Sequence, residues 1–209
     1  MNAPVGKVRL IGGRWRGTRL DVPAVAGLRP TADRVRETLF NWLMPWVPGA
    51  RVIDLFAGTG ALGLEALSRG AASAVLAERD AALASAMRAT LSRLDGGERG
   101  HVVQGDGLAF LRGSADMFDI AFVDPPFAGG LWAQAWPLLA PRLAPDALVH
   151  VESPADVDPA VPAGWALHRE GRTREVRYAL YRVPGTDPAA DTLGADPAAG
   201  EPSTRNENA

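Results

Sequence analysis

A short glycine-rich turn constrains the fold of this chain more than any other stretch. The turn is Asp54-Leu55-Phe56-Ala57-Gly58-Thr59-Gly60, and it joins the run 51–53 to the apolar stretch 61–67. This order predicts a buried strand, a tight turn and the N-terminus of a helix. Glycine lets the backbone approach a ligand closely, and the first N–H groups of a helix are unpaired and lie at its positive end. The stretch therefore predicts a binding site for a small molecule with a polar or anionic part.

Strands and helices alternate after this turn. The expected strands are 52–54, 73–78, 101–104, 118–124 and 147–152. The expected helices are 61–69, 80–94 with Asp80 as its cap, 108–112 and 130–140. Strands separated by helices predict a parallel sheet that is covered on both faces. Segments 165–172 and 175–181 break the alternation and predict an antiparallel hairpin at the end of the sheet. We therefore expect a Rossmann-like α/β fold with a mostly parallel, seven-stranded sheet.

The N-terminal region is basic, although the net charge of the chain is -2. Eight basic and two acidic residues lie between Lys7 and Arg36. Runs 8–11 and 18–22 flank a glycine-rich turn and predict a β-hairpin whose exposed face carries arginines and Trp15. Cations interleaved with an aromatic residue suit RNA, where phosphate pairing and base stacking act together. The alternative is a hairpin that covers one end of the core, with Trp15 buried.

Composition divides the chain and excludes several classes of protein. We expect a basic, RNA-contacting hairpin and helix over residues 1–49, the main domain over 50–183 and a disordered tail over 184–209. The chain has no cysteine, which excludes disulfides and thiolate catalysis, and its three scattered histidines disfavour a metal site. The sequence shows no apolar run near the roughly 20 residues of a membrane span, and from its first residues we expect no signal peptide. We expect a cytoplasmic protein without a metal ion.

The glycine turn alone leaves two cofactors open. Residues 58–63 match the dinucleotide fingerprint G-x-G-x-x-G, but sites for S-adenosylmethionine (SAM) share the same strand, turn and helix. Asp54 lies just before the turn and offers a carboxylate to the ammonium group of SAM, which NAD lacks. This residue favours SAM.

The end of the fourth strand of the main domain favours SAM as well. It reads Asp124-Pro125-Pro126-Phe127, and the carboxyl ends of such strands line the ligand crevice. Proline fixes φ and donates no N–H, so this segment predicts a rigid cleft for a planar amine. The Asp124 carboxylate and the Pro125 carbonyl can accept both hydrogens of an NH₂ group, and Phe127 can stack on the ring. The alternative is a proline-rich turn with an N-cap aspartate.

Several segments together resemble the bacterial 16S ribosomal RNA guanine-N2 methyltransferase family, within the SAM-dependent amino methyltransferases. The segments are Ile11-Gly12-Gly13, Gly17, Leu28-Arg29-Pro30-Thr31, 33–41, 54–60, Asp124-Pro125-Pro126-Phe127 and Val151-Glu152-Ser153. The resemblance spans roughly residues 7–183, and Arg29–Asn41 is its most specific part. It implies a SAM-dependent methyltransferase fold and methyl transfer to N2 of one guanine in small-subunit rRNA, with S-adenosylhomocysteine as product.

The resemblance also implies roles for residues of the cofactor site. The implied cofactor-binding residues are Thr31, Asp54, Phe56, Ala57, Gly58, Gly60, Glu78 and Asp106, and the implied catalytic residues are Asp124, Pro125, Pro126 and Phe127. Glu78 would hold the ribose hydroxyls, Asp106 would face the adenine amino group, and Thr31 would help to hold the cofactor carboxylate. Alternatively, Glu78 could cap a helix beside Asp80. Asp106 could be the N-cap of the helix near Leu108, which would not exclude adenine contact.

The expected partner is 16S rRNA in an assembling small ribosomal subunit, with no membrane and with the chain as a monomer. The residues expected to contact RNA are Arg14, Arg16, Arg19, Arg29, Arg34 and Arg36. Arg34 and Arg36 could instead pair with Glu37 or Asp33, and we expect a structural role for His150. The competing functions are an amino methyltransferase for DNA adenine or protein glutamine, an NAD-dependent oxidoreductase and a non-catalytic RNA-binding protein.

Overall fold

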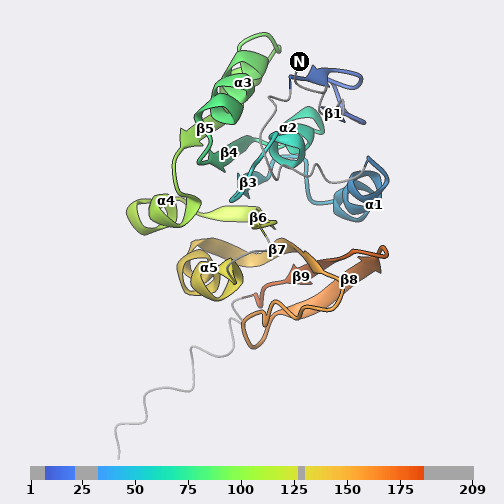
Figure 1. Cartoon of the computed structure of the whole chain (residues 1–209), viewed down its shortest axis with the longest axis vertical. Coiled ribbons are helices and arrows are strands. Elements are labelled where there is room, and N and C mark those ends of the chain that lie inside the picture. Colours follow the sequence, from blue (N-terminus) through green and yellow to red (C-terminus); the bar gives the residue numbers. More distant parts are fainter. Residues whose placement is uncertain (1–7, 22–32, 127–129, 186–209) are drawn as a thin grey trace, which may run out of the picture.

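A seven-stranded sheet with helices on both faces forms the centre of the molecule (Figure 1). The computed structural model describes residues 8–21, 33–126 and 130–185. The strands of this sheet are β3 (Arg51–Asp54), β4 (Ser73–Glu78), β5 (Gly100–Gln104), β6 (Phe118–Val123), β7 (Leu143–Pro154), β8 (Ala166–Arg172) and β9 (Val176–Arg182). Their order is β5-β4-β3-β6-β7-β9-β8, with parallel pairs from β5 to β7 and antiparallel pairs of β9 with β7 and β8. The expected Rossmann-like sheet with an antiparallel C-terminal hairpin is confirmed.

The helices divide between the two faces of the sheet. They are α1 (Asp33–Leu43), α2 (Ala61–Ser68), α3 (Ala81–Leu91), α4 (Gly107–Gly113) and α5 (Leu131–Leu139), with the short 3-10 helices Gly97–Arg99 and Ala140–Arg142. Helices α1, α2 and α3 cover one face, and α4 and α5 cover the other (Figure 1). Along β6, Ile120 and Phe122 join the core beneath α1–α3, whereas Ala121 and Val123 join the core beneath α4 and α5. Both faces of the strand are therefore dry, as in other parallel sheets.

Local sequence signals determine where the helices that follow the strands begin. The Asp80 carboxylate accepts hydrogen bonds from the N–H groups of Ala82 and Leu83 at 2.8 and 3.0 Å, which confirms the N-cap that the sequence predicted. Gly60 precedes α2 with a φ of 76°, a left-handed conformation that favours glycine. Within the described ranges, no helix combines the length and the hydropathy needed to cross a membrane.

Strand β7 is longer than the sequence predicts. It begins at Leu143, whereas the alternating pattern predicts a start at residue 147. The register of β6 and β7 shifts between Phe118 and Ile120, and Asp146 in this stretch has a φ of 63°. A bulge of this kind carries the turn-like residues Pro145 and Asp146 within a continuous strand.

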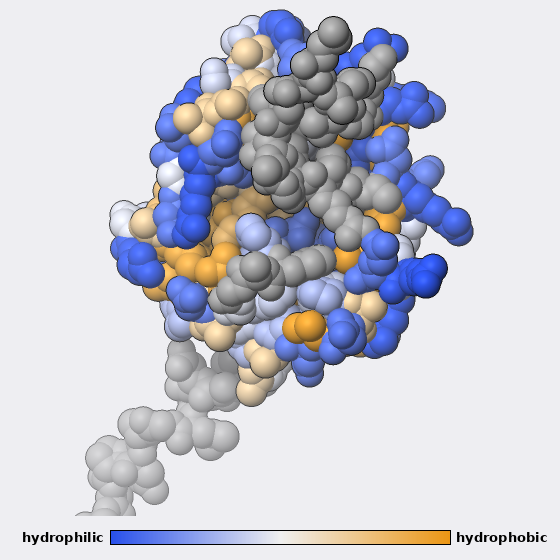
Figure 2. Space-filling model, in the orientation of Figure 1, coloured by the Kyte–Doolittle hydropathy of each residue, from blue (hydrophilic) through white to orange (hydrophobic). Residues whose placement is uncertain are grey.

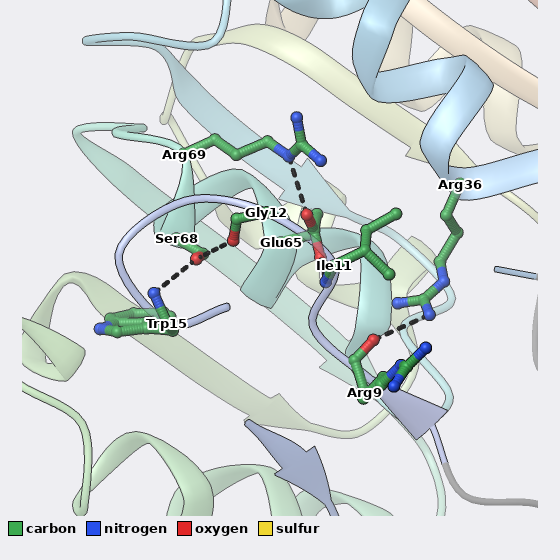
Figure 3. Close-up of polar contacts among 8 residues, drawn as sticks. All are labelled: Arg9, Ile11, Gly12, Trp15, Arg36, Glu65, Ser68 and Arg69. Atoms are coloured by element: carbon green, nitrogen blue, oxygen red, sulfur yellow. Dashed lines mark hydrogen bonds and ion pairs between the residues drawn. The ribbon is translucent and has the colours of Figure 1, made fainter. Parts of the chain in front are cut away.

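The N-terminal hairpin lies against α2. Its strands β1 (Val8–Arg9) and β2 (Arg19–Leu20) are antiparallel and shorter than predicted. Figure 3 shows the loop between them on α2, where the Ser68 hydroxyl donates to the Gly12 carbonyl at 2.6 Å and accepts from the Trp15 N–H at 2.9 Å. These two hydrogen bonds join the backbone of the hairpin loop to one side chain of α2.

Trp15 is buried in this interface. Its side chain is 5% exposed, and its indole N–H donates to the Asp95 carbonyl at 3.0 Å. The expectation that Trp15 lies on an exposed face is wrong, and the alternative of a buried tryptophan is confirmed. The arginines of the loop remain exposed. The surface of the hairpin is therefore cationic, but it does not present Trp15 for stacking.

A buried carboxylate anchors the start of the loop. Glu65 of α2 is completely buried and accepts hydrogen bonds at 2.8 Å from the Ile11 N–H and from Arg69 Nε (Figure 3). The Arg69 guanidinium lies over the Phe40 ring, 5.0 Å from its centroid. A buried charge needs such partners, so the hairpin, α1 and α2 depend on one another.

Two glycines of the loop provide a test of this docking. Gly13 and Gly17 have φ values of 73° and 85°, so alanine at either position costs about 1–2 kcal/mol in backbone strain. An added Cβ at Gly13 would lie 2.0 Å from the Ser68 carbonyl oxygen, but at Gly17 it would meet nothing within 4 Å. We expect Gly13→Ala to lower the free energy of unfolding by about 1–3 kcal/mol more than Gly17→Ala. Urea denaturation measures both, and equal losses would contradict close docking on α2.

Candidate active site at the strand ends

Three carboxylates meet at the C-terminal ends of adjacent strands. β3 lies between β4 and β6 in the sheet, Asp54 ends β3, Glu78 ends β4, and Asp124 directly follows β6. The charges of Glu78 and Asp124 both act on Asp54. The carboxyl ends of parallel strands line the ligand crevice of such folds. Figure 2 shows a hollow in the middle of the molecule, where hydrophobic residues lie beside hydrophilic ones.

Asp54 is an acid held out of water. Its side chain accepts a hydrogen bond from the Gly63 N–H at 3.0 Å, and the residue is 2% exposed. Burial raises the pKa of Asp54 to about 7, with further contributions from the charges of Asp124 and Glu78, while the hydrogen bond from Gly63 opposes the shift. Burial also raises the pKa of Asp124 to about 7. The ionised forms of these two carboxylates are energetically unfavourable without a positively charged partner.

Glu78 braces the glycine turn. One of its oxygens accepts from the Gly58 N–H at 2.7 Å, and the other accepts from the Asp80 N–H at 2.8 Å. Within the turn, Phe56 and Gly58 are partly exposed, whereas Ala57 and Gly60 are buried. Glu78 thus supports the N-cap residue Asp80 and does not itself cap the helix N–H groups, which bind Asp80. Its contact with the ribose stays a prediction.

Asp106 has a structural role that the sequence also allowed. Its carboxylate accepts from the N–H groups of Leu108 and Ala109 at 2.7 and 3.3 Å, as the N-cap of α4, and it pairs with Arg79. Burial raises the pKa of Asp106, but the hydrogen bonds from Arg79 and from these two N–H groups lower it overall. Asp106 is therefore a stable carboxylate beside the crevice, and its contact with adenine stays a prediction.

The arginines predicted to contact RNA fall into different environments. Arg14, Arg16, Arg19 and Arg34 are exposed, and Arg14 pairs with Asp95. Arg36 is completely buried, where it donates to the Arg9 carbonyl at 2.9 Å and to Asp33 at 2.6 Å. Its guanidinium does not reach the surface, which agrees with the alternative of pairing with Asp33. Arg29, Thr31 and Phe127 lie outside the described residues, while Pro125 is buried and Pro126 exposed.

Two residues beyond the predicted site lie near Asp124. Glu152, which contributed to the resemblance without a role, is 7% exposed and follows Val151, the residue paired with Val123 of β6. His150 is completely buried, and burial lowers its pKa to about 4. A neutral, buried imidazole agrees with the structural role that we expected for His150. The position of Glu152 depends on strand pairing, so no local signal reveals it.

The residues of the crevice fit a cationic ligand. Three carboxylates lie beside the glycine turn, so the site attracts positive charge. SAM carries an ammonium and a sulfonium group, whereas the pyrophosphate of NAD is negative. No group of residues that could hold a metal ion occurs in the described part of the chain. Asp54 and the turn at Gly58 would hold SAM, which supplies an electrophilic methyl group.

Comparison with known proteins places the chain in a family. The family described as Conserved hypothetical protein 95 matches residues 8–182. The chain belongs to this family. It is 49% identical over 180 residues to ribosomal RNA small subunit methyltransferase D of Escherichia coli K12, across 85% of this chain and 90% of that protein. The Haemophilus influenzae protein of the same name is 43% identical over 182 residues, across 85% of this chain and 94% of the relative.

A solved structure supports the same conclusion. The structure of the putative methyltransferase yhhF from Escherichia coli has a TM-score of 0.78 at 47% identity, over 86% of this chain and 99% of that one. The chain is a SAM-dependent methyltransferase with a Rossmann-like fold, as the sequence predicted. The open choice between SAM and NAD is thus decided for SAM.

The raised pKa values of Asp54 and Asp124 predict a pH dependence of SAM binding. A bound cation favours the ionised carboxylates, so binding below pH 7 must release protons that these groups hold in the free protein. We expect the affinity to fall as the pH decreases through about 7, by up to about tenfold per pH unit for each proton released, and to level off above it. Calorimetry between about pH 6 and 8 measures this dependence. Asp54→Asn should weaken binding and flatten the profile, and a flat profile in the unaltered protein would contradict the prediction.

Proposed function

We propose that this protein transfers the methyl group of SAM to the exocyclic N2 of a guanine in the 16S rRNA of the small ribosomal subunit. The observation that carries the proposal is the Asp124-Pro125 step directly after β6, beside the acid-lined cofactor site. The relatives named ribosomal RNA small subunit methyltransferase D support RNA as the substrate.

Asp124 and Pro125 orient the amine in this proposal. Their carboxylate and carbonyl oxygens accept hydrogen bonds from the two hydrogens of N2, which turns the nitrogen lone pair toward the methyl carbon. The new N–C bond forms as the C–S bond breaks, and the electron pair of that bond stays on sulfur in S-adenosylhomocysteine. Orientation and charge placement are the sources of catalysis.

Asp124 also has a pKa suited to the proton that must leave. After transfer, N2 carries one positive charge and an extra proton, and the Asp124 carboxylate accepts that proton and later releases it to water. Burial raises the pKa of Asp124 to about 7, and a proton acceptor works best with a pKa near the operating pH. Pro125 is buried beside it, so one side of the amine meets a packed surface.

The target base must leave its stack to reach this cleft. An enzyme that modifies a base inside a helix flips it into a pocket and reads its edge there. We propose that Phe127, outside the described residues, stacks on the flipped base. Thr31, Glu78 and Asp106 keep their proposed contacts with the cofactor.

The N-terminal extension is proposed to hold the RNA. Arg16 and Arg19 are exposed in the hairpin, and Arg34 is exposed on α1, so their cations can neutralise phosphates. This surface corresponds to the expected RNA-contacting extension 1–49, ahead of the SAM-binding domain 50–183. An assembling small subunit would present the RNA to a monomer.

The role of Asp124 is tested by Asp124→Ala. We expect loss of methylation by about 10²-fold or more, because the amine loses its orientation and its proton acceptor, while SAM still binds. Asp116→Ala, at an exposed acid before β6, is the matched control and should leave the rate unchanged. The assay combines methylation of 16S rRNA with mass mapping of nucleosides. Methylation only of DNA adenine or of protein glutamine would replace the proposal by its alternative, and full activity of Asp124→Ala would refute the mechanism.

The RNA surface is tested by the double variant Arg16→Ala/Arg19→Ala. We expect weaker RNA binding and a salt slope reduced by roughly one for each phosphate that the variant no longer neutralises. Arg112→Ala, an exposed arginine at the end of α4, is the control that should bind normally. Titrations at several salt concentrations measure the slope, and an unchanged slope in the double variant would leave the hairpin with a structural role only.

A further inference from the structure

A second carboxylate lies next to Asp124 along the edge of the sheet. β6 and β7 are parallel, and Val123 and Val151 form the last pair in their register. The residues that follow them are Asp124 and Glu152. Adjacent strands are about 4.8 Å apart, so the two acids start from neighbouring backbone positions.

Both acids belong to the same face of the sheet. Side chains alternate along a strand, so Asp124 and Glu152 share the face of Phe122 and His150, which precede them by two residues. The rings of Phe122 and His150 do lie on one face, because they contact each other edge to face with centroids 6.1 Å apart. From this strand geometry we infer that the two carboxylates lie side by side above the packed rings of Phe122 and His150.

Glu152 is also supported from its other side. It pairs with Tyr178 of β9, and the Tyr178 ring stacks on Trp42 of α1 at 5.5 Å and 23°. Glu152 is 7% exposed and Tyr178 9%. The backbone of Glu152 is therefore held in place, and its side chain is largely shielded from water. A hydrogen bond to such a carboxylate discriminates strongly between a base that donates and one that does not.

We propose that Glu152 selects guanine by accepting the N1–H of the base whose N2 is held by Asp124. This inference rests on the proposed function. Guanine presents N1–H and N2–H side by side as donors, and two neighbouring carboxylates complement them. Adenine presents an unprotonated N1 next to its amino group, so a carboxylate at that position faces a lone pair and rejects the base. Glu152 is in this account a positioning and specificity residue, and Asp124 remains the group that acts on the amine.

The test compares guanine with 2-aminopurine at the target position of the same RNA. 2-Aminopurine keeps the N2 amine but has a lone pair at N1, as adenine does. We expect the unaltered protein to prefer guanine by at least about tenfold in kcat/KM, because the contact with N1–H is charge-assisted. In Glu152→Gln the amide can donate to N1, so the preference should fall by about tenfold or more, with a lower kcat/KM for guanine. Glu152→Ala, which removes the carboxylate, should also lower the preference.

Two controls separate the outcomes. Glu98→Gln, at an exposed acid outside the crevice, should keep the full preference, and calorimetry with SAM identifies the Glu152 variants that retain the cofactor site. An unchanged preference in a Glu152 variant that binds SAM would overturn the inference, as would equal rates on both bases with the unaltered protein. Absence of N2-methylguanine with the unaltered protein would instead refute the proposed function.

Discussion

The hydrogen bond from the Gly63 N–H to the buried Asp54 carboxylate joins the central strand β3 to the helix α2. All eight residues of α2 are buried, so the position of this helix is determined by its contacts and not by solvent. One end of α2 begins at the glycine turn that faces the crevice. The other end carries Glu65 and Ser68, which hold the N-terminal hairpin. A shift of α2 would therefore disturb both the cofactor site and the hairpin.

The acids of the crevice work against the stability of the free protein. Asp54 and Asp124 are raised to pKa values of about 7, so their ionised forms are unfavourable in the folded chain relative to the unfolded one. This part of the stability is present at low pH and is lost as the pH rises from about 4 toward 7. A cationic ligand removes the penalty by pairing with the same groups. The site therefore lowers the stability of the free folded protein and favours the binding of a cation, a combination that is common at functional sites.

Features encoded locally could be predicted from the sequence, and features that depend on pairing across the fold could not. Asp80 as a helix cap and the strand of Asp54 before its glycine turn follow from short patterns, and both are found. The burial of Trp15 depends on Ser68 and Asp95, far along the chain, so its sequence context indicated exposure equally well.

The same limit applies to the candidate site. The glycine turn and the Asp124 segment were recognisable because each is contiguous, and their proximity followed from the rule for strand ends. Arg36 lies in a basic segment that is typical of RNA contacts, but its turn of α1 faces the core. Glu152 becomes a neighbour of Asp124 only through the register of β6 and β7, which a bulge sets and which no short motif reports.

The length of α2 has a consequence for how a target is chosen. Eight residues of helix extend about 12 Å, and the dry packing on every side keeps that length constant. If RNA binds at the hairpin as proposed, its bound phosphates and the methyl group at the glycine turn would lie a fixed distance apart. Only a nucleotide at that distance from the bound phosphates could then enter the cleft. The position of the base relative to the hairpin would contribute to target selection, besides the chemical identity of the base.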